Sequence, residues 1–219
     1  MDHPLRQIIV TTAVLALSAC ATTAVRSVCP DRAAADYYFE RGVLDSRGRD
    51  LDRHASRWIS RHLKAMGEPS LSCETTDRVF RFIRLHPPDN PVAVRAIDRG
   101  DVFTLVAVEL EGTAGTAGTR PGKILERRES PLSEDDIEEI RSAVEAAGFW
   151  ELPTSETLSV RDGNVMIYDS GGSLWILEAA EPGRYHVVCR GSLGSEPIQG
   201  IGLLFLRLAR LGAGGEEDY

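Results

Sequence analysis

Apolar residues recur every three to four positions in the first third of the chain, which is the spacing of an amphipathic helix. The clearest case is Leu51–Met66, and Gly67 followed by Pro69 predicts where this helix ends. Asp31 can cap a shorter helix that runs through Phe39. The N-terminal part of the fold is therefore predicted to be helical.

Two more helices are predicted towards the end of the chain. Residues 133–147 begin with a serine and an acidic first turn, which suits the positive end of a helix, and a glycine follows them. Residues 196–211 carry apolar side chains at helical spacing and are predicted to stop at Gly212. Gly200 and Gly202 each weaken this helix by roughly 1 kcal/mol relative to alanine, so we expect them to permit close packing against another element.

Between these helices the pattern changes to runs of β-branched and aromatic residues. Short connections that contain glycine separate several of the runs, as in β-hairpins, and Ser170-Gly171-Gly172 is one of these connections. The predicted strands are 79–86, 92–97, 102–110, 123–129, 164–169, 173–178 and 184–190. Strands in a run, a helix, further strands and a closing helix predict an α+β fold with a mainly antiparallel sheet.

The first 20 residues have the pattern of an export signal. Ile8–Leu17 is an apolar run that is too short to span a bilayer, which takes roughly 20 residues. The sequence Leu17-Ser18-Ala19-Cys20 resembles the bacterial lipobox, whose cysteine receives diacylglycerol. We expect cleavage before Cys20 and anchoring through its acyl chains, and an ordinary signal peptide is the alternative. In a Gram-negative cell, Ala21 in place of aspartate favours the periplasmic face of the outer membrane.

These patterns divide the chain into five segments. Removal of the signal leaves 219 − 19 = 200 residues, a length that suits one domain with a helical extension. The predicted segments are a lipoprotein signal peptide at 1–19, a lipidated tether at 20–30, an N-terminal helical segment at 31–72, an α+β domain at 73–211 and a disordered tail at 212–219.

The formal net charge of the chain is −8, and no cluster of lysine and arginine stands out. This balance argues against a nucleic-acid partner, because phosphates need basic patches. Besides Cys20, the chain has Cys29, Cys73 and Cys189, which can form one disulfide in an oxidising compartment. Spacing leaves the pairing open, but Cys29 and Cys73 are favoured because they bracket the helical segment. No spacing of a zinc site is present, so we expect no metal or other cofactor.

The stretch Asp169-Ser170-Gly171-Gly172 resembles the nucleophile loop of chymotrypsin-type serine proteases. Ser170 is therefore a candidate nucleophile, with His86 or His186 as its base. The surroundings favour a turn instead, because the protease loop has a glycine where this chain has Tyr168 and no histidine lies in that family's usual setting. Two adjacent glycines also supply the positive φ that a tight turn needs.

A cationic and aromatic surface is the other candidate site. On a strand, His186 and Arg190 point to the same face, and several polar or aromatic residues flank them on neighbouring strands. The candidate ligand surface comprises His86, Trp175, Tyr185, His186 and Arg190. A hydrolytic acid/base site of His186 with Glu178 is an alternative. The competing interpretation places the tryptophans in the core, His186 in an ordinary hydrogen-bonded position and the arginines on a solvent-facing sheet.

Four further stretches are WISRHLKAMGEPSL at 58–71, RFIRLHPPDNPVAVR at 81–95, GFWELP at 148–153 and SLWILEAAEPGRYHVVCR at 173–190. Together they resemble an uncharacterised group of bacterial, chiefly proteobacterial, envelope lipoproteins. This chain has Gly171-Gly172 where that group has an Asp-Gly pair. The resemblance implies an exported, lipid-anchored α+β protein and assigns no catalytic residue.

The leading hypothesis from the sequence is a non-enzymatic periplasmic lipoprotein, anchored through Cys20, that binds or supports another envelope component. Its expected partners are the membrane, through the lipid anchor, and an envelope protein or cell-wall ligand. The alternatives are a periplasmic hydrolase that uses Ser170 or the His186/Glu178 pair, and a carrier of a small ligand or peptide that uses the sheet face near Trp175.

Overall fold

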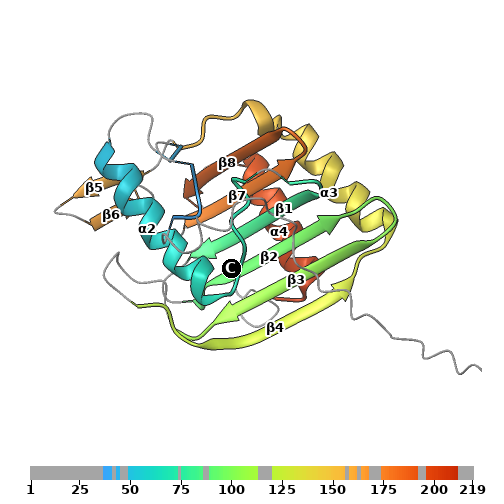
Figure 1. Cartoon of the computed structure of the whole chain (residues 1–219), viewed down its shortest axis with the longest axis horizontal. Coiled ribbons are helices and arrows are strands. Elements are labelled where there is room, and N and C mark those ends of the chain that lie inside the picture. The colour runs from blue at the N-terminus through green and yellow to red at the C-terminus, as the bar shows by residue number, and fades with distance from the viewer. Residues whose placement is uncertain are drawn as a thin grey trace, which may run out of the picture.

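A computed structural model of the chain describes residues 37–40, 43–44, 49–73, 75–85, 89–112, 120–155, 158–161, 164–167, 174–191 and 196–211. The predicted α+β fold is confirmed: hairpin-connected strands form an antiparallel sheet, and helices pack against it (Figure 1). The predicted signal peptide, tether and C-terminal tail lie outside the described residues.

Six strands form the main sheet in the order β4-β3-β2-β1-β7-β8, and every neighbouring pair is antiparallel. The central strands are buried along most of their length, whereas β4 alternates between exposed and half-buried residues. The strands are β1 (Arg78–Leu85), β2 (Val92–Asp98), β3 (Phe103–Leu110), β4 (Ile124–Pro131), β7 (Leu174–Glu181) and β8 (Arg184–Gly191).

Two short strands lie outside this sheet. β5 (Leu158–Arg161) and β6 (Asn164–Ile167) pair with each other, whereas β7 pairs with β1 on one side and with β8 on the other. The hairpin predicted between residues 164–169 and 173–178 is therefore wrong, because both edges of β7 are occupied by other strands. The connecting residues 168–173 lie outside the described part of the chain.

Helices cover both faces of the main sheet. α2 (Arg49–Ala65) packs on one face, and α3 (Glu134–Ala146) and α4 (Glu196–Ala209) pack on the other (Figure 1). The α2-side core includes Ile59, Leu63, Ile83 and Ile176, and the opposite core includes Phe82, Ile140, Leu177 and Phe205. The expectation of arginines on a solvent-facing sheet is wrong, since β1 and β2 are covered on both faces.

The predicted boundaries of α2 and α3 agree with the hydrogen bonds at their ends. At the end of α2, Gly67 has a φ of 67°, and its amide donates to the Lys64 carbonyl at 3.0 Å. At the start of α3, Ser133 and Asp136 form a capping box. Gly148, with a φ of 59°, follows α3 and precedes the short 3-10 helix η1 (Phe149–Glu151).

Gly202 provides the close approach of α4 to the sheet. A Cβ atom placed on Gly202 would lie 2.5 Å from Cζ3 of Trp175 and 2.7 Å from Cε2 of Phe82. A Cβ atom on Gly200 would meet nothing within 4 Å. The prediction that these two helical glycines permit close packing against another element is therefore confirmed for Gly202 and wrong for Gly200.

The segment before α2 contains a bend and a turn where it is described. Residues 37–40 are not helical, so the helix predicted through Phe39 does not include that residue. The Tyr38 amide donates to Ser60 Oγ at 3.1 Å, and the Tyr38 carbonyl accepts a hydrogen bond from Ser70 at 2.7 Å. No helix in the described part of the chain is long and apolar enough to cross a membrane.

Candidate functional site

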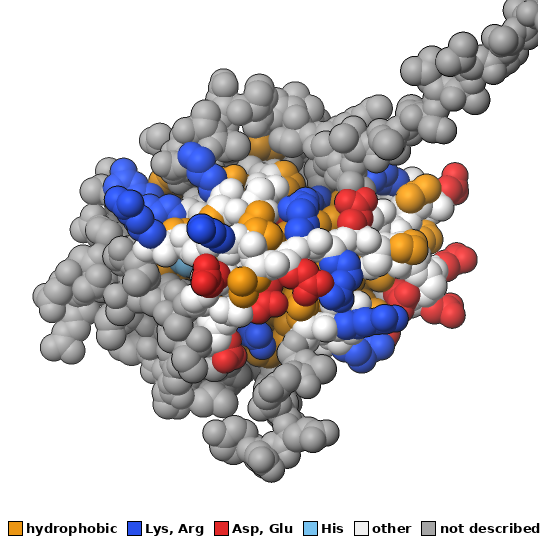
Figure 2. Space-filling model, turned by 90° about the horizontal axis from the view of Figure 1, so that it is seen from below, with side chains coloured by type: hydrophobic (Ala, Val, Ile, Leu, Met, Phe, Trp, Pro, Cys, Tyr) orange, Lys and Arg blue, Asp and Glu red, His pale blue; other side chains and the backbone are white. Residues whose placement is uncertain are grey.

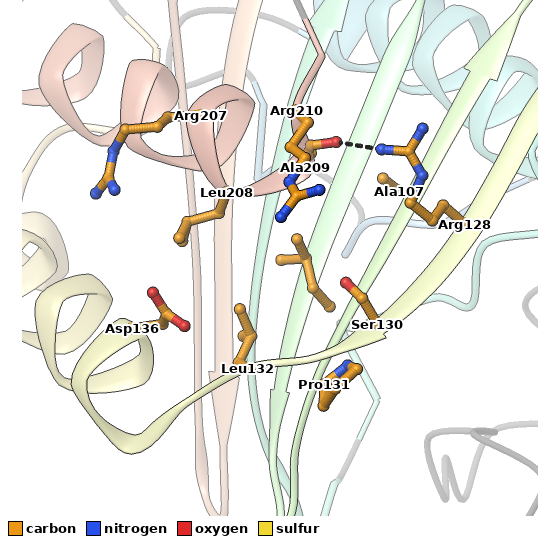
Figure 3. A pocket seen from close by; sticks show the side chains of 11 residues that line it. Ala107, Arg128, Ser130, Pro131, Leu132, Asp136, Arg207, Leu208, Ala209 and Arg210 are labelled. Carbon is orange, nitrogen blue, oxygen red and sulfur yellow. Dashed lines mark hydrogen bonds between the residues drawn. The ribbon is translucent and has the colours of Figure 1, made fainter.

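A cavity of about 580 Å³ lies between α3, α4 and the strands β3 and β4. This volume is in the range of small-ligand sites. Leu105 and Ala107 of β3 are buried in its wall, and Leu132 and Leu208 are half-buried. Polar and charged residues from β4, α3 and α4 complete the lining (Figure 3). The cavity therefore combines apolar surface with charged groups.

Three arginines line this cavity, and two of them already have partners. Arg128 of β4 donates to the last carbonyl of α4 at 3.0 Å and pairs with Glu126. Arg207 of α4 donates to both carboxylate oxygens of Glu139 at 2.6 Å. Arg210 forms no ion pair with any described residue. In the view of Figure 3, its side chain lies between Leu208 and Arg128. Arg210 is thus the lining cation available to an anionic ligand.

The backbone of Arg210 is in the left-handed region, with a φ of 53°. Among the residues that the structure describes, every other positive φ belongs to a glycine. The amides of Arg210 and Leu211 donate to the carbonyls of Arg207 and Leu206, both at 3.0 Å, and close α4 in a Schellman arrangement. The predicted stop at Gly212 is wrong, because the left-handed residue comes two positions earlier.

The equivalent position at the end of α2 is Gly67, which adopts this conformation without a Cβ penalty. For a residue with a side chain, the left-handed conformation costs roughly 1–2 kcal/mol. Arginine at position 210 is therefore unfavourable for stability alone. A strained residue at the wall of a cavity is a reason to look for function there.

Asp136 places one negative charge at the cavity, at the start of α3. Its carboxylate accepts hydrogen bonds from the Ser133 hydroxyl at 2.6 Å and the Ser133 amide at 2.9 Å. These bonds hold the pKa of Asp136 below its ordinary value, and Arg207 acts in the same direction. The cavity lining therefore presents three arginines against a single ionised aspartate.

β4 forms one edge of the main sheet beside the cavity. Ile124 and Leu125 at its start are 45% and 55% exposed. Figure 2 shows the molecule from below, the side on which β4 lies in Figure 1, and basic, acidic and hydrophobic side chains are interspersed there. An edge strand can pair with an extended peptide, so the cavity and β4 together form a candidate peptide site.

The predicted ligand surface does not form in the structure. Trp175 is buried beneath Gly202 on the α3/α4 face, where His186 also packs, whereas Tyr185 lies against the α2-side core. Successive side chains of a strand point to opposite faces of the sheet, so Tyr185 and His186 of β8 lie on different faces. His86 lies outside the described residues. The competing interpretation, with Trp175 in the core, is confirmed.

His186 and Arg190 share a face, as predicted, but both attach a neighbouring segment to the edge of the sheet. The ring Nε2 of His186 donates to the Leu152 carbonyl at 2.9 Å, and Arg190 donates to the Pro153 carbonyl at 2.7 Å. Burial lowers the pKa of His186. These contacts fasten residues 152–154 to β8, so the two side chains have a structural role.

A second polar cluster lies buried on the α2 face, and we call it the Arg81 network. Its charged members are at most 3% exposed. Arg81 of β1 donates from Nε to Glu178 of β7 at 2.8 Å, and Arg95 donates to Glu68 at 2.8 Å. The Tyr185 hydroxyl donates to Glu178 at 2.9 Å. The network consists of Glu68, Arg81, Arg95, Glu178 and Tyr185.

The Arg81 network is a structural element because its charges compensate one another. Burial raises the pKa of Glu178, and the Arg81 guanidinium opposes that shift. Burial also raises the pKa of Tyr185 well above its ordinary value, and Glu178 acts in the same direction. Glu178 and His186 lie on opposite faces of the sheet, so the predicted acid/base pair does not form one site.

Several predicted sites fall outside the described residues, among them Ser170, Cys20 and Cys29. Cys73 is buried, and its pairing with Cys29 stays a prediction because Cys29 lies outside the described residues. Within the described ranges, no group of three or more histidine, cysteine, aspartate or glutamate residues is placed to hold a metal ion.

The cavity residues were missed because they come from distant parts of the sequence. Arg128 lies on β4 and Arg207 on α4, and only the folded sheet brings them together. One signal was present: Arg207 and Arg210 are only three residues apart, at the end of the predicted C-terminal helix. A comparison with known protein families and with curated proteins gave no match for this chain.

Proposed function

We propose that this protein is a lipid-anchored binding protein of the bacterial envelope, and that its cavity binds an acidic segment of a partner protein. The lipobox-like sequence that ends in Cys20 supports the anchor, and Ala21 after it favours the periplasmic face of the outer membrane in a Gram-negative cell. The observation that carries the binding role is Arg210, a strained cation at the cavity wall without a carboxylate partner among the described residues.

The chemistry of the cavity favours a carboxylate ligand that also has apolar groups. A carboxylate can accept two parallel hydrogen bonds from the planar guanidinium of Arg210. Leu132 and Leu208 offer apolar surface beside that cation. The edge of β4 adds backbone donors and acceptors, which match an extended peptide better than a free anion.

A binding role is favoured over catalysis because the candidate catalytic groups that the structure describes are engaged elsewhere. Glu178 and Tyr185 belong to the buried Arg81 network. His186 is hydrogen-bonded to a backbone carbonyl. Each of these groups stabilises the fold, so none is placed to activate a substrate.

Binding can be tested with a fluorescein-labelled pentapeptide, Glu-Leu-Glu-Val-Glu, and the full-length protein in detergent micelles. We expect the peptide's fluorescence anisotropy to rise on binding, and Arg210→Gln to weaken the affinity about tenfold or more, because a hydrogen bond to a charged group contributes roughly 1.5–3 kcal/mol. Arg184→Gln is the matched control, since Arg184 lies at the opposite edge of the sheet. The proposal would be contradicted if both variants lost the same affinity for the peptide, or if the wild-type protein bound a Gln-Leu-Gln-Val-Gln peptide equally well.

The anchor requires its own test. Cells that express the protein are grown with an alkyne-tagged fatty acid, and the label on the protein is measured. We expect labelling of the wild-type protein and its loss in Cys20→Ala. Persistent labelling of the variant would exclude Cys20 as the anchor.

A further inference from the structure

We infer that the acidic sequence Glu216-Glu217-Asp218 of this chain docks in the same cavity and competes there with the partner. This inference rests on the proposed function of the cavity and describes its regulation. The occupant is a segment of the protein itself, and it is recognised by the same carboxylate chemistry as the partner.

The charges of the segment complement those of the cavity. Glu216, Glu217 and Asp218 are consecutive carboxylates in a part of the chain without lysine or arginine. The cavity lining presents Arg128, Arg207 and Arg210 against one aspartate. Of these cations, Arg210 is the one without an ion pair to a described residue, so it is the first that the segment would engage.

The segment is close enough to reach the cavity. Residues 207–210, at the end of α4, line the cavity, and the described chain continues to Leu211. Glu216 follows Leu211 by five residues, which span at most about 18 Å when extended. Three of the four intervening residues are glycines, so the sequence permits the reversal of direction that docking needs.

Attachment to α4 makes even a weak contact effective. A short flexible connection gives an effective concentration on the order of 1 mM. If the segment binds with a dissociation constant between about 1 mM and 0.1 mM, an external peptide is weakened roughly two- to tenfold. The same segment on a second copy of the protein would compete only at its bulk concentration, which favours docking within one chain.

Docking can be detected without any partner by zero-length crosslinking. The variant Arg128→Lys introduces an amine on the far wall of the cavity, and a carbodiimide joins an amine to a carboxylate in contact with it. We expect a crosslinked peptide that joins position 128 to residues 216–218, at the mass of a monomer. Arg184→Lys is the control, because it places the same amine at the opposite edge of the sheet. Circular dichroism verifies that both variants fold.

Competition is measured with the same Glu-Leu-Glu-Val-Glu probe. The triple variant Glu216→Gln/Glu217→Gln/Asp218→Asn should bind the probe about two- to tenfold more tightly than the wild-type protein, and increased salt should reduce that difference. The matched control Asp101→Asn/Glu111→Gln/Glu145→Gln removes the same number of exposed negative charges outside the cavity lining, and it should leave the affinity within twofold.

The outcomes distinguish this inference from the proposed function. A crosslink at position 128 together with tighter binding by the triple variant supports both. Probe binding that the triple variant leaves unchanged, or a crosslink no stronger than that at position 184, overturns docking and leaves the binding role intact. A crosslink found only in dimers overturns docking within one chain. If neither the wild-type protein nor the triple variant binds the probe, the proposed function fails, and competition fails with it.

Discussion

Arg81 and Glu178 lie directly opposite each other on β1 and β7, with both side chains fully buried, and Arg81 donates from Nε and Nη2 to one carboxylate oxygen. Tyr185 donates to the other oxygen of that carboxylate. Arg81 also donates to the Pro69 carbonyl at 2.6 Å, beside Glu68. The pair therefore joins the centre of the sheet to the segment that follows α2.

The first prediction concerns the removal of one member of this pair. Glu178→Leu leaves the Arg81 guanidinium buried without its main partner, so the free energy of unfolding should fall by about 3–5 kcal/mol. The double variant Arg81→Met/Glu178→Leu should recover part of that loss, because it buries no uncompensated charge. Urea denaturation followed by circular dichroism measures both values.

Arg184→Gln provides the control for this experiment. Arg184 forms partly exposed ion pairs with Glu151 and Glu181, which contribute about 0–1 kcal/mol. Its guanidinium also lies 4.0 Å from the centre of the Trp150 ring, a contact that contributes about 0.5–1 kcal/mol at an exposed site. If Glu178→Leu lowered the free energy of unfolding by no more than Arg184→Gln does, the Arg81 network would not have the stabilising role assigned to it.

The sequence predicted the elements of this fold well, but not the network. The predicted strand 79–86 has arginines between apolar residues, which is also the pattern of a half-exposed strand. Arg81 is nevertheless buried, because α2 and the following segment cover that face and supply Glu68. No local pattern predicts that Arg81 has a partner 97 residues away. Glu178 is brought opposite Arg81 only by the pairing of β1 with β7.

The second prediction uses two glycines of α4 as a matched pair. Gly202→Ala should lower the free energy of unfolding by about 1–3 kcal/mol, because its methyl group would overlap Trp175 and Phe82. Gly200→Ala should raise it by about 0.5–1 kcal/mol, since its methyl group meets nothing and alanine favours the helix. Thermal unfolding compares the two variants. Equal effects would mean that α4 does not lie as close to β7 as Gly202 indicates.

The third prediction concerns the pH dependence of the α3 capping box. The folded-state pKa of Asp136 lies below its ordinary value of 3.8, so its contribution is fully present above that pH and is lost as the pH falls through the folded-state pKa. Asp136→Asn should therefore lower the unfolding temperature at pH 7, and the difference from the wild-type protein should shrink below about pH 4.

Asp135→Asn is the control for the capping box. It removes the same charge from the same helical turn but leaves the Ser133–Asp136 hydrogen bonds in place. A pH dependence of equal size in both variants would assign the effect to the general charge of the first turn.

The candidate site was less predictable than the fold for a physical reason. The end of α4 was placed at Gly212 because glycine is the usual left-handed residue, and Arg210 takes that conformation instead. The rules for helix ends predict the residue that is most stable at each position. They therefore miss Arg210, because glycine would be more stable in its left-handed conformation. For Trp175 the sequence leaves two interpretations, the candidate ligand surface and the core, and the core placement is the correct one because Trp175 lies in an apolar strand that is buried.

The fourth prediction separates stability from binding at Arg210. Arg210→Gly removes the strain of the left-handed conformation, so the free energy of unfolding should rise by about 1 kcal/mol, while the affinity for the acidic probe falls. Arg210→Gln keeps the strained backbone and loses the charge, so it should weaken binding with little change in stability. Urea denaturation and fluorescence anisotropy are measured on both variants. If Arg210→Gly were destabilising, the side chain would be retained for a structural contact, and its assignment to ligand binding would be wrong.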